Sequence, residues 1–129
     1  EPGSAIVQVA SSIAFMPAPN FAVYAATKAY VLSFARALEF ELRPRKIRVT
    51  AVCPGPVRTE FFEVAGRSEA EPGKTKRQLK AEMPMMAEAK DVVREALADA
   101  ARGKAVSIFG APFKLFAAMA PFMPTELAM

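Results

Sequence analysis

The residues with the clearest chemical potential are a tyrosine and a lysine four positions apart, Tyr24 and Lys28, in the run Y-A-A-T-K. A spacing of four is a little more than one helical turn, so on a helix the two side chains share a face. A phenol alone is a weak acid with a pKa of about 10, and an ammonium nearby favours its ionised form. Ser11, thirteen residues upstream, carries a hydroxyl that could hold a carbonyl or alcohol oxygen. The three residues predict proton exchange at an oxygen whose carbon gains or loses a hydride.

The elements around this pair are more informative than the spacing, because many helices contain Y-x-x-x-K by chance. Residues 5–10 are apolar with β-branched side chains, which predicts a strand ending near Ser11. Residues 21–42 are rich in helix formers and predict a long helix, and residues 47–53 predict a second strand. A strand, a helix and a strand joined by short links predict a βαβ unit with parallel strands.

This unit brings the chemical residues to one place. Ligands of open parallel α/β sheets bind outside the carboxyl ends of the strands. Ser11 follows the first strand and residues 54–59 follow the second, while Tyr24 and Lys28 lie in the first turns of the connecting helix. We therefore expect these segments to converge on one edge of the sheet.

Two stretches carry a resemblance to a known family. They are G-S-A-I-V-Q-V-A-S-S-I-A-F-M-P-A-P-N-F-A-V-Y-A-A-T-K-A-Y and I-R-V-T-A-V-C-P-G-P-V-R-T-E-F. From residue 5 to about residue 61 the chain resembles the short-chain dehydrogenase/reductase family, in which a strand-end serine, Y-x-x-x-K and a P-G-x-V-x-T loop follow in this order. The resemblance implies an α/β fold: the carboxyl-terminal half of a doubly wound, Rossmann-like parallel-sheet domain, with residues 1–129 as a single partial domain. The family's T-G-x-x-x-G-x-G loop does not occur in the sequence, and we expect it in an amino-terminal half that precedes Glu1.

The resemblance also implies an activity, that of an NAD(P)-dependent oxidoreductase that interconverts an alcohol and a carbonyl. Tyr24 would be the general acid or base, Lys28 would support its ionisation and hold the nicotinamide ribose, and Ser11 would orient the substrate oxygen. The family spacing of thirteen selects Ser11, but in the family pattern S-S-x-A-G the second serine acts, so Ser12 stays a candidate. The choice between NAD and NADP is not readable from these residues. The cofactor-binding residues implied by the resemblance are Tyr24, Lys28, Pro54, Gly55, Val57 and Thr59.

Two other functions stay open. Without the glycine-rich loop that cradles the cofactor phosphates, the chain could be a truncated, non-catalytic remnant that acts only as an oligomerisation or interaction module. It could also be a scaffold that binds lipid or protein without redox work. The helix over residues 24–42 is apolar almost all round, which predicts burial on more than one side. By resemblance, we expect its second side to form a homodimer or homotetramer; the alternative is packing against the expected amino-terminal half of the same chain.

The remainder of the chain offers weaker signals. Residues 60–87 are polar with interspersed apolar side chains, and by resemblance predict a segment that closes over an apolar alcohol or carbonyl substrate. The same apolar side chains could equally pack onto the core. Residues 89–102 predict an amphipathic helix and residues 105–109 a last strand. The apolar tail, residues 112–129, predicts core or interface packing.

Composition narrows the possibilities further. The 129 residues have a net charge of +4 and are 53% hydrophobic, which is a globular composition. The absence of histidine excludes Ser-His-Asp and Cys-His catalysis and the usual zinc sites within these residues, and we expect no metal. The basic residues are scattered, so we expect no nucleic-acid partner, and no run reaches the roughly 20 apolar residues of a transmembrane helix. The one cysteine, Cys53, ends a strand-like run and predicts a buried structural thiol, in keeping with a cytoplasmic location.

Overall fold

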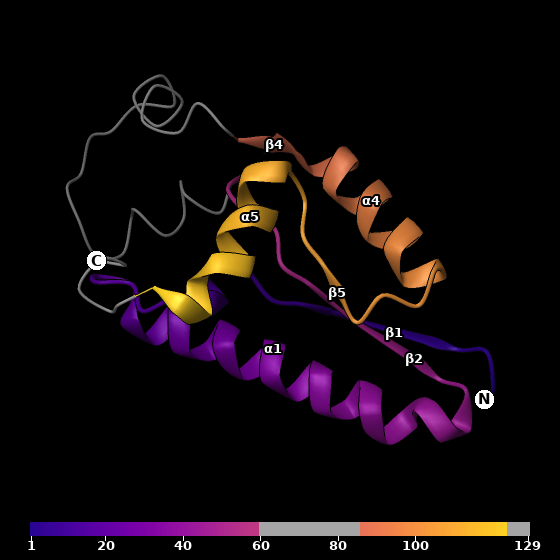
Figure 1. Ribbon diagram of the computed structural model, residues 1–129. Helices are drawn as coiled ribbons and strands as arrows, with labels where there is room; N and C mark the ends of the chain where they lie inside the picture. The colour runs from indigo at the N-terminus through magenta and orange to yellow at the C-terminus, as the bar shows by residue number, and fades with distance from the viewer. Residues whose placement is uncertain (60–85, 124–129) are drawn as a thin grey trace.

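A parallel three-stranded sheet forms the centre of the structure, a computed structural model that describes residues 1–59 and 86–123. The strand order is β1-β2-β5, and both pairings are parallel. Helix α1 runs along one face of the sheet and helix α4 along the other, as Figure 1 shows. The strands and helices are β1 (Ala5–Val9), α1 (Ala22–Leu42), β2 (Arg48–Val52), β3 (Val57–Arg58), β4 (Ala87–Glu88), α4 (Ala89–Ala101), β5 (Val106–Ser107) and α5 (Ala111–Met119).

Strand β2 is the core of this arrangement. Four of its five residues are buried, as is Cys53 directly after it, because α1 covers one side and α4 the other. A strand buried on both faces reads as a continuous apolar run, which is why V-T-A-V-C was readable in the sequence. Its one hydroxyl, on Thr50, donates a 2.7 Å hydrogen bond to the Lys104 carbonyl, so burial leaves no polar atom unsatisfied there.

Helix α1 buries only a narrow stripe. Ala25, Leu32 and Ala35 are buried against the sheet, at helical spacing. The second side of the helix is open within the described residues, where Tyr30 and Phe40 are 68% and 71% exposed, so its burial by a second subunit stays a prediction. The helix ends where Arg43–Arg45 form a 3-10 turn, and Lys46 then adopts a left-handed conformation with φ of 55°.

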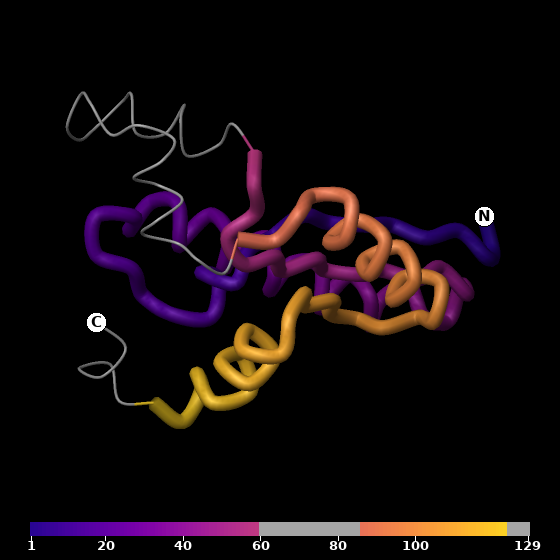
Figure 2. Tube along the Cα trace, turned by 90° about the horizontal axis from the view of Figure 1, so that it is seen from above, coloured from indigo at the N-terminus to yellow at the C-terminus, as the bar shows by residue number. Residues whose placement is uncertain are grey.

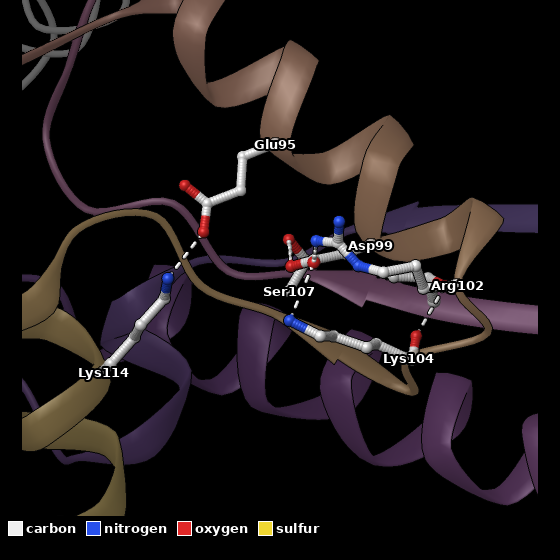
Figure 3. A network of polar contacts seen from close by, with 7 residues as sticks. Glu95, Asp99, Arg102, Lys104, Ser107 and Lys114 are labelled. Carbon is white, nitrogen blue, oxygen red and sulfur yellow. Dashed lines mark hydrogen bonds and ion pairs between the residues drawn. The ribbon is translucent and has the colours of Figure 1, made fainter.

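A buried carboxylate joins α4 to β5. Asp99, 1% exposed, accepts a 2.8 Å hydrogen bond from the Ser107 hydroxyl and forms ion pairs with Arg102 and Lys104 (Figure 3). Burial by itself raises the pKa of this carboxyl, but the hydrogen bonds from Lys104, Arg102 and Ser107 outweigh burial and lower the pKa to about 2. The network fixes the turn that returns the chain from α4 to the sheet.

Most predicted elements are present with adjusted boundaries. The strand predicted over residues 5–10 ends at Val9, and the one predicted over 47–53 is Arg48–Val52. The helix predicted over 89–102 is Ala89–Ala101, whereas the predicted strand 105–109 pairs only over Val106–Ser107. The predicted substrate-covering segment lies largely outside the described residues.

Two elements were not predicted. β3 and β4 form a separate two-stranded parallel sheet, Val57 opposite Ala87 and Arg58 opposite Glu88. The tail contains helix α5, which lies beside the sheet rather than over it when viewed from above (Figure 2). In the described part of the tail, Leu115, Met119 and Phe122 are more than half exposed, so the choice between core and interface packing stays open.

Candidate active site

A cleft at the carboxyl ends of β1 and β2 contains every residue to which the sequence assigned a chemical role. Its volume is about 450 Å³. It receives residues from β1 and the turn after it, from the start of α1, from the segment after β2 and from α4. The predicted site residues that line it are Ser11, Ser12, Tyr24, Lys28, Pro54, Gly55, Val57 and Thr59.

Backbone hydrogen bonds hold the two strand ends together at this cleft. The Ala10 amide donates to the Val52 carbonyl at 2.8 Å, and the Ser12 amide donates to the Pro54 carbonyl at 2.9 Å. Parallel pairing therefore continues past the end of the strands, and the two turns leave the sheet side by side. This is why residues forty positions apart face one cleft.

The two serines are both placed in the cleft, in different conformations. Ser11 is extended and its Oγ accepts a 3.3 Å hydrogen bond from the Ile13 amide, so it caps the 3-10 helix Ser12–Phe15. Because Ser12 already belongs to that helix, the alternation of strand side chains does not apply to this pair. Both hydroxyls remain candidates for orienting a ligand oxygen, and the preference for Ser11 stays a prediction.

Tyr24 and Lys28 lie one helical turn apart on α1, as the spacing predicts. The Lys28 ammonium is 5.7 Å from the centre of the Tyr24 ring. Its nitrogen also donates a 3.1 Å hydrogen bond to the Val9 carbonyl, the last residue of β1. The Phe21 and Tyr24 rings meet edge to face, with 6.4 Å between their centres. The strand end thus fixes the lysine, and the preceding aromatic residue restricts the tyrosine.

Cys53 lies behind the cleft and takes no part in its lining. It is fully buried, and burial raises the pKa of its thiol to about 11, although a hydrogen bond from the Ser11 backbone opposes the shift. A neutral buried thiol is a poor nucleophile. The interpretation of Cys53 as a structural residue agrees with this environment.

The segment after β2 is fixed by its pairing with β4. The Ala87 amide donates a 2.9 Å hydrogen bond to the Pro56 carbonyl, and the side chains of Arg58 and Glu88 form an ion pair at 3.0 Å. β4 leads directly into α4, whose first turns contribute Ala89, Val92 and Val93 to the cleft. Sequence reasoning missed these three residues; the amphipathic pattern of α4 was visible, but not which sheet edge its first turn reaches.

Comparison with protein families agrees with this geometry. The profile of the short chain dehydrogenase family matches residues 1–70, which is more than half of the sequence. The chain therefore belongs to the short-chain dehydrogenase/reductase family, as the motifs predicted.

Curated relatives match the same part of the chain. A short-chain type dehydrogenase/reductase from Picea abies is 44% identical over 68 residues, which cover 53% of this chain and 25% of that protein. Dehydrogenase/reductase SDR family member 4 from Homo sapiens is 41% identical over 59 residues, covering 46% of this chain and 21% of that protein. The matched part thus spans about a quarter of the length of these relatives.

Solved structures share the fold. A short-chain dehydrogenase from Burkholderia cenocepacia in complex with NADP matches 97% of this chain and 46% of its own, with 26% identity and a TM-score of 0.69. The enzyme from Sphingobium yanoikuyae in complex with NADPH matches 92% of this chain and 43% of its own, with 29% identity and a TM-score of 0.66. A 3-ketoacyl-(acyl-carrier-protein) reductase from Brucella melitensis complexed with NADH matches 81% and 42%, with 28% identity and a TM-score of 0.61. The predicted Rossmann-like α/β fold, covered in part, is confirmed.

Proposed function

We propose that this chain forms the catalytic half of an NAD(P)-dependent oxidoreductase that interconverts an alcohol and a carbonyl compound. The observation that supports it best is the convergence of the Ser11, Tyr24–Lys28 and 54–59 segments on a single cleft. Family membership and the cofactors named for the three solved relatives point the same way.

The residues of the cleft fit the nicotinamide end of such a cofactor. The turn after β2 offers backbone groups at Val57 and a hydroxyl at Thr59, and Lys28 offers an ammonium for ribose hydroxyls. The sequence contains no glycine-rich T-G-x-x-x-G-x-G loop for the phosphates, so this chain supplies only part of the cofactor's contacts. When bound, the nicotinamide supplies or accepts the hydride.

The protein's own contribution is the proton. In reduction Tyr24 gives its phenolic proton to the substrate oxygen, and in oxidation its phenolate takes the proton back. Lys28, held by the Val9 carbonyl, places its positive charge 5.7 Å from the centre of the Tyr24 ring. A serine hydroxyl, from Ser11 or Ser12, donates a hydrogen bond to the substrate oxygen and fixes its position. The apolar walls of the cleft favour an apolar alcohol or ketone as substrate.

Titration with NADPH and with NADH tests cofactor binding by this chain directly. The chain has no tryptophan, so the fluorescence of the reduced nicotinamide can be followed without interference. If this chain can bind the nicotinamide end of the cofactor, we expect the fluorescence of the reduced nicotinamide to increase and to saturate with concentration. No binding of either cofactor at millimolar concentration would favour the alternative function, that of a truncated, non-catalytic interaction module.

Tyr24→Phe tests the catalytic role, in the protein together with the segment that supplies the phosphate-binding loop. We expect turnover to fall by a factor on the order of 10² to 10⁴, with cofactor binding largely unchanged. Tyr30→Phe is the matched control, because Tyr30 is the chain's other tyrosine and lies on the exposed side of the same helix. Near-normal turnover in Tyr24→Phe would sink the assignment.

The remnant function is supported by a different observation, the open edge of β1. Among the described residues β1 pairs only with β2. The Ser4 carbonyl and the Ala10 amide bond to β2, so the backbone groups of Val7 and Val9 face the other way, where Lys28 donates to the Val9 carbonyl. Val7 and Val9 are also 40% and 60% exposed. Such an edge, together with the exposed side of α1, suits an interaction module, and the proposed homo-oligomer through α1 is common to both functions.

A further inference from the structure

The turn at residues 54–56 separates the candidate active site from a second cavity. This cavity has a volume of about 220 Å³ and is lined mainly by apolar groups from the start of α5, from Phe109 and from the residues next to β4. Gly55 and Pro56 line both the second cavity and the cleft. The backbone of this turn therefore separates the two spaces, with the proposed site for the nicotinamide end of the cofactor on one side and α5 on the other.

Gly55 contacts the ring of Phe113 so closely that no side chain fits between them. A Cβ placed on Gly55 would lie 2.6 Å from Cε2 and Cζ of Phe113 and 2.8 Å from its Cε1. Carbon atoms prefer a separation of about 3.5 to 4.0 Å. The backbone at Gly55 does not have a positive φ, so it is space and not conformation that calls for glycine here.

The backbone that carries Phe113 is held in place at the start of α5. The chain enters α5 through Gly110, whose φ of 87° favours glycine, and the Lys114 amide closes the first turn on the Gly110 carbonyl at 3.1 Å. The neighbouring side chain, Lys114, forms an ion pair with Glu95 of α4 at 2.6 Å (Figure 3). Since α4 also lines the cleft, α5 is tied to the site on two sides.

We propose that Phe113 is a positioning residue for the reaction: its ring supports the turn at Gly55 and thereby sets where Val57 and Thr59 meet the nicotinamide end of the cofactor. The expected effect on cofactor binding rests on the proposed function. Phe113 touches neither the cleft nor Tyr24 among the contacts described. Its effect therefore falls on cofactor affinity more than on proton transfer.

A size exchange between the two residues tests this directly. Gly55→Ala should raise KM for the reduced cofactor by about 10- to 100-fold, because the new methyl group and the ring cannot both stay in place. Phe113→Leu alone should raise KM by a smaller factor, because the turn loses support. The double variant should recover most of the loss caused by Gly55→Ala, while kcat changes less than KM in all three. A matched control is Phe122→Leu, since Phe122 is 88% exposed.

Unchanged KM in Gly55→Ala would overturn the proposal, and so would a double variant as impaired as the sum of the two single ones. A second measurement remains available if the protein binds no cofactor and the proposed function itself fails. The backbone ¹H–¹⁵N resonances of Val57 and Thr59 should shift in Phe113→Leu without any ligand, and should stay in place in Phe122→Leu. Equal shifts in both variants, or none in Phe113→Leu, would refute the positioning role independently of catalysis.

Discussion

Replacing Asp99 by asparagine probes the contact that fixes α4 to the sheet. The side chain of Asp99 is 2% exposed, with Ser107 donating at 2.8 Å and the Lys104 ammonium at 2.9 Å. Asparagine has the same shape but no charge, and its amide group presents donors to the two cations. We expect the free energy of unfolding to fall by about 2 to 3 kcal/mol at neutral pH. This follows from the change in the carboxyl's pKa from 3.8 to about 2, at about 1.4 kcal/mol for each pKa unit.

The same shift sets the pH dependence. Because the folded-state pKa is depressed, the contribution is present above the unfolded pKa of 3.8 and is lost as the pH falls towards about 2. The difference between the wild-type protein and Asp99→Asn should therefore be largest at neutral pH and should shrink steadily below pH 4. The exposed parts of Arg102 and Lys104 allow some screening, so added salt should reduce the difference modestly.

Urea unfolding followed by circular dichroism, repeated across this pH range, measures the effect. Asp91→Asn is the matched control, because Asp91 lies on the same helix but its side chain is 37% exposed, and it pairs only with the exposed Arg94 among the described contacts. The control should lose less than about 0.5 kcal/mol. A loss of that size in Asp99→Asn, or a difference that does not change between neutral and acidic pH, would refute the reasoning.

Three further predictions follow from the burial, the exposure and the hydrogen bonds of particular side chains. Cys53 should react with a thiol reagent near neutral pH only after unfolding, since burial raises the pKa of the thiol to about 11. Labelling with Ellman's reagent, with and without urea, measures this reactivity. Rapid labelling of the native protein would contradict the prediction. Substitution of Tyr30 and Phe40 by serine should lower the sedimentation coefficient if α1 mediates self-association, whereas an unchanged value would place any interface elsewhere. Arg48→Met should lower stability by about 1 kcal/mol, because its guanidinium donates to two backbone carbonyls, at 2.6 Å and 3.3 Å, from segments far away in the sequence. Thermal unfolding checks the last value, and a melting temperature equal to that of the wild type would contradict it.

The site was predictable because its parts depend on local signals and on one topological rule. Helix formers and a proline two residues after Leu42 predicted α1, and a continuous apolar run predicted β2. Once the order strand, helix, strand is known, the carboxyl ends of the strands must share an edge. Ser11, Tyr24 and Lys28 consequently reach one cleft without any knowledge of side-chain packing.

Short non-local pairings carried no such signal. β3 and β4 contain two residues each and lie about thirty positions apart, so neither has a readable period. The bounds of α5 were equally hidden, because its composition is apolar apart from Lys114 and gives no clear face. What covers the second side of α1 was hidden for the same reason: its apolar side chains indicate what could be buried, and burial of that side by a second subunit stays a prediction.

The sequence by itself predicted the chemistry that we propose for this protein, through the types and order of Ser11, Tyr24, Lys28 and the P-G-x-V-x-T turn. Only the tertiary structure decided which side chain packs against that turn, namely Phe113. Contact between Gly55 and Phe113 joins residues 58 positions apart, and it depends on the closure of α5 against α4 through Glu95 and Lys114. Propensity and periodicity act over a few residues, whereas close packing is set by whichever distant side chain reaches the same space.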